Sequence, residues 1–237
     1  GVGDLCFYVD GAGDNNAVAT GDEKLRIASD GKIGIGGATS PEELLDLGNA
    51  LQINLKVGGR AYLGQGYSTA ATILGHSVKA KTTGTVSGGM EVTETNSGGG
   101  APAAMRMQSG RIEFHTAASG TSGATFDSER ARIDSSGRLL IGTTTLGDAS
   151  ADNLNIADSG HCGVTIRSGS SNYGNLFFTD LTSGDQFQGY VQYNHSDNSL
   201  RLGTQKLERL RIASNGFVGI NEDDPQTELN VRGTIST

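Results

Sequence analysis

The sequence predicts an all-β protein, and three observations carry this prediction. Apolar and polar residues alternate with a period of two in many segments of about five residues, which is the pattern of half-buried strands. Glycine supplies 37 of the 237 residues without the Gly-X-Y period of collagen. One short pattern occurs three times along the chain.

The repeated pattern is predicted to form a β-hairpin. Its copies cover residues 23–36, 129–142 and 208–220, at spacings too long and too unequal for a solenoid. In each copy apolar and polar residues alternate on both sides of a polar link. A glycine that can adopt a positive φ closes each link: Gly31, Gly137 and Gly216.

A single helical turn and a further strand are predicted after the first and third hairpins. Residues 40–43 (Ser-Pro-Glu-Glu) form a capping box with proline at the first helical position, and residues 224–227 repeat it without the glutamate. Alternating strands follow at 45–47 and 229–231. The second copy reaches its strand at 154–156 only after a longer link without proline.

The inserts between the hairpins are predicted to be β-rich. Two regions rich in Gly, Ser and Thr, 87–102 and 117–127, are expected to be surface loops. We divide the chain into residues 1–55 with the first hairpin, 56–147 with an insert and the second hairpin, and 148–237 with an insert and the third. Alternating segments within the inserts lie at 50–64, 105–107, 111–115, 164–167, 175–178 and 190–193.

Such short hairpins need either closure into a barrel or a partner chain, and we favour the partner chain. They leave strand edges open, and only 35% of the residues are hydrophobic, so one chain has little apolar area to bury. We therefore expect an elongated homotrimeric fibre in which the hairpins are clasps that meet their copies at a three-fold axis. Close approach there would favour Gly34, Gly36, Gly142 and Gly219. The residues expected at the trimer interface are Leu25, Ile27, Ile33, Ile35, Ile133, Leu139, Ile141, Leu210, Ile212, Val218 and Ile220.

Each hairpin also carries a glutamate followed three residues later by an arginine. These residues could lie on a solvated strand face, where each pair would contribute well under ~1 kcal/mol. Alternatively, the arginine could bind a carboxylate of the next subunit and fix the rotational register. We favour the inter-subunit interpretation, because core-facing residues flank each arginine. The pairs are Glu23 with Arg26, Glu129 with Arg132, and Glu208 with Arg211.

The third hairpin carries a family resemblance. Residues 208–220 (Glu-Arg-Leu-Arg-Ile-Ala-Ser-Asn-Gly-Phe-Val-Gly-Ile), the Asp-Pro pair at 224–225, and the stretches 194–212 and 229–236 resemble shaft segments of tailed-bacteriophage tail fibres and tailspikes. The resemblance implies a homotrimeric virion appendage for host attachment. It also implies partners among other tail or baseplate proteins and a host cell-surface receptor, which we expect to be a glycan.

In that family, such a segment commonly precedes a C-terminal intramolecular chaperone that assembles the trimer and is then removed by self-cleavage. We therefore expect Thr237 to lie at or near the mature terminus, or the gene to continue into such a chaperone. A polysaccharide-degrading tailspike and a trimeric extracellular adhesin remain alternative interpretations.

The composition argues against several other functions. A net charge of −8 disfavours nucleic acid and anionic membranes as partners, and no apolar run approaches the ~18 residues of a membrane-spanning helix. A glycosidase needs two carboxylates and usually aromatic platforms, but the chain has no Trp, and turns or the hairpin account for Glu113, Asp127 and Glu129. The four histidines are scattered, so we expect no catalytic centre, metal or cofactor.

Exposed tyrosines are the candidates for receptor contact, although strand packing is the commoner reason for a tyrosine in a strand. The residues are Tyr62, Tyr67 and Tyr173. The two cysteines, Cys6 and Cys162, lack the spacing of a metal or redox site and are expected to be small buried residues.

Overall fold

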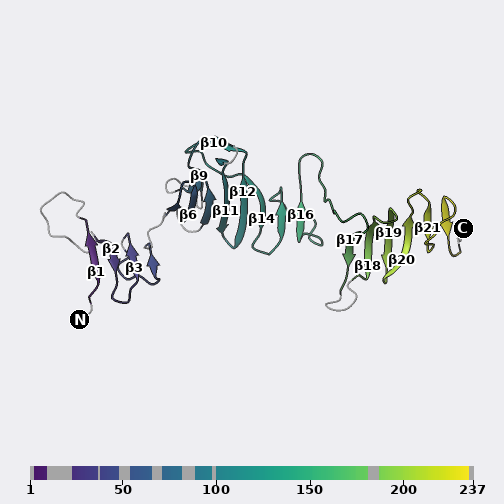
Figure 1. The fold of residues 1–237 in the computed structure, drawn as a ribbon, viewed down its shortest axis with the longest axis horizontal. Coiled ribbons are helices and arrows are strands. Elements are labelled where there is room, and N and C mark those ends of the chain that lie inside the picture. The colour runs from purple at the N-terminus through teal and green to yellow at the C-terminus, as the bar shows by residue number, and fades with distance from the viewer. Residues whose placement is uncertain are drawn as a thin grey trace. The chain divides into compact units, whose positions relative to one another are not determined.

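The all-β prediction is confirmed. The computed structural model describes residues 3–9, 23–36, 38–47, 54–65, 71–81, 89–97, 100–180 and 187–234. Twenty-two strands and no α-helix lie within these ranges (Figure 1). The chain divides into two compact units, residues 1–162 and 163–237.

A four-stranded sheet occupies the beginning of the first unit. Its strands are hydrogen-bonded in sequence order, with the first three antiparallel and the last parallel to its neighbour. The strands are β1 (Leu5–Tyr8), β2 (Glu23–Ile27), β3 (Ile33–Ile35) and β4 (Leu45–Asp46).

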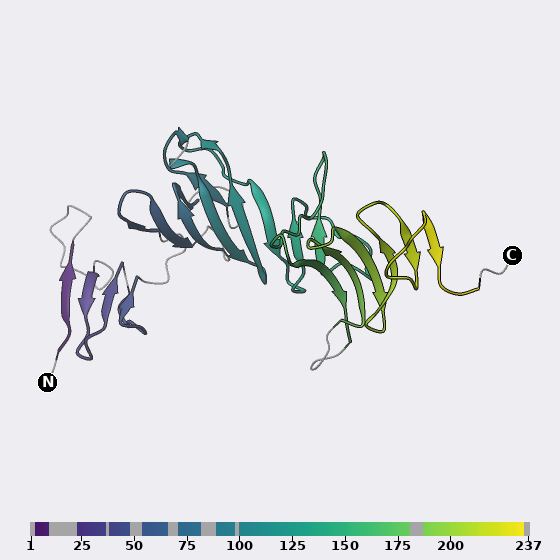
Figure 2. The same ribbon diagram turned by 45° about the vertical axis from the view of Figure 1, so that its right-hand side comes forward.

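An eight-stranded sheet forms the rest of the first unit's framework (Figure 2). All of its neighbouring strands are antiparallel except β15 and β16, which are parallel. In spatial order the strands are β16 (Leu154–Ile156), β15 (Leu139–Ile141), β14 (Glu129–Ile133), β12 (Arg111–Thr116), β11 (Ala103–Gln108), β7 (Thr72–His76), β6 (Ala61–Gln65) and β5 (Asn54–Val57).

A small second layer covers part of one face of this sheet. Its strand pairs are β8 (Val78–Ala80) with β9 (Met90–Val92), and β10 (Asn96–Ser97) with β13 (Ser119–Gly120). The buried core of the first unit lies between this layer and the sheet, and its members are Ala71, Ile73, Val78, Ala80, Met90, Val92, Ala104 and Phe126.

This core corrects our expectation of surface loops at 87–102 and 117–127. Met90, Val92 and Phe126 come from those two regions and are buried. The regions are rich in Gly, Ser and Thr, but their few large apolar side chains all point onto the sheet, where burial stabilises the layer.

The second unit is built on a six-stranded sheet whose strands follow the chain order. Only its last two strands are parallel to each other. The strands are β17 (Tyr173–Phe178), β18 (Gly189–Asn194), β19 (Ser199–Thr204), β20 (Leu207–Ile212), β21 (Val218–Ile220) and β22 (Leu229–Val231). Two strands of the eight-stranded sheet lie across the boundaries of our sequence segments: β5 spans the boundary at 55, and β16 lies beyond the boundary at 147.

The three sequence copies form the same hairpin with a parallel third strand. The hairpins are β2–β3, β14–β15 and β20–β21, and the third strands are β4, β16 and β22. The glycine predicted to close each link has a positive φ of 87°, 81° and 87° in chain order. Its amide donates to the carbonyl oxygen three residues earlier at 2.8–2.9 Å. We call each copy the three-strand motif.

The helical turns predicted after the first and third hairpins are wrong, because both links are irregular. In the third motif, Asn230 Oδ1 on the third strand accepts hydrogen bonds from the amides of Gln226 (3.0 Å) and Thr227 (2.8 Å). In the first motif, the amide of Ile33 binds the carbonyl oxygen of Leu44 at 2.9 Å. In both links, backbone groups that a helical turn would hydrogen-bond internally are instead bonded to the strands.

Contacts and backbone angles within one chain already require glycine at the positions that we placed at a three-fold axis. A Cβ on Gly34 would lie 2.1 Å from the carbonyl oxygen of Ala38, and one on Gly219 would lie 2.0 Å from that of Glu222. Gly36 and Gly142 both have a φ of 72°. Backbone approach within the motif and left-handed backbone explain these glycines without a neighbouring chain.

Replacing Gly34 by Ala is therefore expected to destabilise the protein by about 1–3 kcal/mol, because the backbone of the link must move away from the new methyl group. Gly59→Ala is the matched control, since a Cβ there meets no atom within 4 Å and the residue has no positive φ. Thermal unfolding of the two variants measures the difference. Equal melting temperatures would contradict the close packing of the link.

Candidate functional site

A β-bulge at the start of each hairpin determines where its charged residues point. The strand register shifts between Phe7 and Tyr8, and at the equivalent places on β12 and β19. One extra residue lies on the hairpin strand at each shift: Lys24, Arg130 and Arg209. The bulge puts the residues at i and i+3 on the same face of the strand, whereas a regular strand would put them on opposite faces.

The glutamate and arginine of each motif consequently bind each other. Each arginine donates one hydrogen bond to each carboxylate oxygen of its own glutamate. The two distances are 2.8 and 2.7 Å in the first motif, 2.5 and 2.5 Å in the second, and 2.6 and 2.9 Å in the third. The bidentate pairing raises the pKa of Arg26, Arg132 and Arg211 and lowers that of Glu23.

This geometry differs from the inter-subunit pairing that we expected. The carboxylate that each arginine binds belongs to its own strand, because the bulge brings Glu23, Glu129 and Glu208 within reach. The sequence signal that could have revealed this is the extra residue that interrupts the alternation just after each glutamate.

A row of apolar side chains crosses the face of the eight-stranded sheet that lies opposite the Glu–Arg pairs. Cross-strand neighbours in this row are Leu55 with Leu63, Leu63 with Leu74, Leu74 with Met105, Met105 with Phe114, Ile112 with Ile133, Ile133 with Leu139, and Leu139 with Leu154. Polar residues lie on the same face only toward the strand ends: Gln65, Thr72, His76 and Thr116. Phe114 and Leu74 remain 42% and 51% exposed. No described residue of this unit buries that face.

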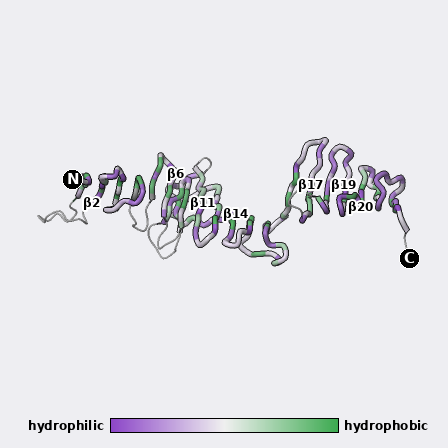
Figure 3. The backbone as a smooth tube through the Cα atoms, turned by 90° about the horizontal axis from the view of Figure 1, so that it is seen from below, coloured by the Kyte–Doolittle hydropathy of each residue, from purple (hydrophilic) through white to green (hydrophobic). Residues whose placement is uncertain are grey.

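The other two sheets have the same kind of face. In the four-stranded sheet, Leu5 lies opposite Ile27, Ile27 opposite Ile33, and Ile33 opposite Leu45. The six-stranded sheet carries an apolar row across all six of its strands, formed by Leu176, Val191, Leu202, Leu210, Ile220 and Val231. Green, hydrophobic segments and purple, hydrophilic segments are interspersed along the tube in Figure 3. We call these three surfaces the apolar faces.

All residues that we expected at the trimer interface lie on the apolar faces. Seven of them are exposed by 37–40%: Ile27, Ile35, Ile133, Leu139, Ile141, Ile212 and Ile220. The other four are half-buried: Leu25, Ile33, Leu210 and Val218. Cross-strand pairing places them together within each sheet, on the side opposite the Glu–Arg pairs.

A buried charge cluster lies on the polar side of the eight-stranded sheet, and we did not predict it. Glu113 on β12 is fully buried, directly opposite Arg106 on β11 and Arg132 on β14. Arg106 binds one oxygen of Glu113, and Arg111 Nε donates to the other at 2.5 Å. Burial alone would raise the pKa of Glu113, but His115, Arg106 and Arg111 outweigh it and hold the pKa well below its usual range.

The cluster also brings together a possible set of metal ligands. Glu113, His115 and Glu129 each offer an atom within 4.8 Å of the others. Nε2 of the buried His115 lies 3.5 Å from Glu113 Oε2, and neither ring nitrogen makes a well-formed hydrogen bond with a described residue. However, a guanidinium group already binds each oxygen of both carboxylates. Three nearby arginines oppose a further cation, so we interpret the cluster as an ion-pair network rather than a metal centre.

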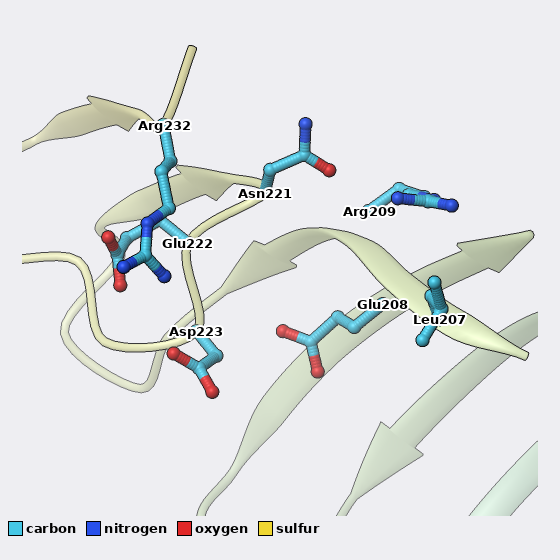
Figure 4. A pocket seen from close by; sticks show the side chains of 7 residues that line it. All are labelled: Leu207, Glu208, Arg209, Asn221, Glu222, Asp223 and Arg232. Carbon is cyan, nitrogen blue, oxygen red and sulfur yellow. The ribbon is translucent and has the colours of Figure 1, made fainter.

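A hollow in the second unit tests the glycosidase alternative (Figure 4). It has a volume of about 450 Å³ and is lined by Leu207, Glu208, Arg209, Asn221, Glu222, Asp223 and Arg232. The carboxylates of Glu208 and Asp223 point toward the same space in Figure 4. Arg211 donates a hydrogen bond to each oxygen of Glu208, so both oxygens of this carboxylate are already engaged within the chain and neither is free to bind a glycosidic oxygen.

The predicted receptor residues have different environments. Tyr173 is 49% exposed on β17, the end strand of its sheet. Tyr62 is half-buried, with Lys56 Nζ 5.6 Å from its ring centre. Tyr67 lies outside the described residues.

Of the cysteines expected to be buried, Cys6 is partly buried and Cys162 is exposed, so the expectation for Cys162 is wrong.

Comparison with known proteins does not assign a family. The chain matches no protein-family model, and no curated protein is similar to it in sequence. Among the described residues, no helix is long and apolar enough to cross a membrane. The apolar faces are therefore the feature on which a functional conclusion can rest.

Proposed function

We propose that the chain is a structural segment of a homotrimeric fibre, in which the apolar faces of three copies pack together around a common axis. The observation that carries this proposal is the continuous apolar face on each of the three sheets. Monomeric proteins rarely leave such large apolar patches exposed, and patches of this kind usually mark an interface.

A second copy of the chain is the partner that fits these faces. The eight-stranded sheet covers part of its polar side with its own small layer and leaves the apolar side open, although Met90, Val92 and Phe126 show that the chain can supply a covering layer. All three sheets leave an apolar face open, as expected if each sheet packs against the same sheet of another copy. Three narrow faces around an axis would enclose one apolar core and leave the Glu–Arg pairs on the outside.

The fibre is proposed to be part of a bacteriophage tail and to serve in attachment to the host. This step rests on the resemblance of residues 194–236 to tail-fibre shaft segments. It implies a virion location, other tail or baseplate proteins as neighbours, and a host surface glycan as receptor. The engaged carboxylates of Glu113, Glu129 and Glu208 favour a structural role over a catalytic one.

We expect the protein to bind bacterial surfaces without cleaving their polysaccharides. The fluorescently labelled protein is incubated with a panel of bacterial strains and their purified surface polysaccharides, and bound label and released reducing ends are measured. We expect binding to a subset of strains and no release of reducing ends. Release of reducing ends that Glu208→Gln abolishes would instead favour the polysaccharide-degrading tailspike. Binding to no strain would contradict the attachment role.

A further inference from the structure

Residues 164–167 have the sequence of a strand but no strand partner. Val164 and Ile166 alternate with Thr165 and Arg167, and we predicted a strand from this pattern. In the structure the segment between β16 and β17 has no regular element (Figure 1). Residues 163–168 form no backbone hydrogen bond with any described residue, and Val164 and Ile166 are 69% and 54% exposed.

A second sign of a missing partner is the hydroxyl group of Ser168. Its Oγ is buried and has no hydrogen-bond partner among the described residues. Buried polar atoms are almost always hydrogen-bonded, because an unpaired one costs about 1–3 kcal/mol. The segment therefore lacks partners for its backbone and for one of its side chains.

An open strand edge lies in the same unit. Among the described residues, β17 pairs only with β18, so its other edge presents unpaired amides and carbonyls. Leu176 and Phe178 on this strand are 53% and 56% exposed on the apolar face. Such an edge is a template for a strand from another chain.

The chain does not pair these two elements with each other. A turn in which the amide of Asn172 binds the carbonyl oxygen of Gly169 at 2.9 Å brings the segment back toward β17. Ile166 Cγ2 then lies 3.6 Å from the place where a Cβ on Gly174 would be. The Ile166 side chain thus approaches the start of β17 while the two backbones remain unbonded.

We propose that residues 164–167 of one copy add as a strand to the β17 edge of a neighbouring copy. This inference rests on the proposed trimer. The donor and acceptor are different parts of the surface, so the contact is heterologous and can close into a ring, as a three-fold axis requires. Val164 and Ile166 would extend the apolar face beside Leu176, and Thr165 would lie beside Asn175 on the polar side.

Cysteine cross-linking tests whether residues 164–167 of one copy pair with β17 of another, which we call the strand exchange. Cys6 and Cys162 are replaced by Ser, Thr165→Cys and Asn175→Cys are introduced together, and the full chain is oxidised and run on a denaturing, non-reducing gel. We expect covalent dimers and trimers that collapse to monomer on reduction. The pair Thr165→Cys and Ser214→Cys is the control, because Ser214 lies in the exposed β20–β21 loop, and it should give far fewer cross-links.

Native mass measured on the same samples separates the two proposals. A trimer whose oxidised chains all run as monomers would overturn the strand exchange and leave the trimer in place. A monomeric native mass would overturn the trimer itself. Hydrogen exchange provides an independent measurement: the amides of residues 164–167 should exchange at least tenfold more slowly in the trimer than those of an unpaired segment, and fast exchange in a stable trimer would contradict the pairing.

Discussion

Replacing Phe114 by Glu is expected to prevent assembly of the trimer. Phe114 lies on the apolar face of the eight-stranded sheet, between Met105 and Ala131 on the neighbouring strands. Covering its exposed part should stabilise each chain by roughly 2 kcal/mol at ~25 cal/mol per Å², and a carboxylate there would lose this and add an unpaired buried charge. Size-exclusion chromatography with light scattering measures the loss of trimer.

The matched control is Ser135→Glu, which introduces the same charge in the exposed loop of the β14–β15 hairpin. It should assemble like the natural chain. A Phe114→Glu variant that is folded and still trimeric would show that the apolar face of the eight-stranded sheet is not the interface. Circular dichroism of both variants verifies that the strands are retained.

Replacing Glu113 by Ala is expected to destabilise the fold by about 3–5 kcal/mol, because it removes the buried carboxylate that Arg106 and Arg111 share. Glu94→Ala is the control: its carboxylate pairs with Arg60 at 2.7 Å and is 38% exposed, so its loss should destabilise the fold clearly less than the loss of the fully buried Glu113. Urea unfolding measures both variants. Similar unfolding midpoints would show that the buried network contributes little.

The same carboxylate predicts a pH dependence of stability. The pKa of Glu113 is lower in the folded chain than its ordinary value of 4.5, so the folded state favours the ionised form. The stabilisation is therefore complete above the ordinary pKa and is lost as the pH falls toward the folded-state pKa. The urea midpoint of the natural chain should fall more between pH 7 and pH 3 than that of Glu113→Gln.

The periodic parts of the structure could be predicted from the sequence. Alternation and the three motif copies identified the hairpins and the eleven hairpin residues on the apolar faces, because both depend on local spacing along the chain. The small layer was missed since Met90, Val92 and Phe126 are isolated among Gly, Ser and Thr. Their burial depends on residues distant in sequence, which a local pattern does not report.

The charged residues show a different limit of sequence reasoning. The pairing of Glu129 with Arg132 depends on a bulge at Arg130, and a single extra residue reverses the face on which a side chain lies. The position of Glu113 opposite Arg106 and Arg132 depends on the register of three strands. Two-residue alternation predicts which faces are apolar, but not which charges meet across strands.

Native mass spectrometry of the purified chain tests the central claim most directly. If the apolar faces are an interface between copies, the folded protein should have three times the chain mass of 24.4 kDa, and dilution to nanomolar concentration should not dissociate it quickly. A folded, soluble species with the mass of one chain would contradict the account, because the apolar faces of all three sheets would then be exposed to water.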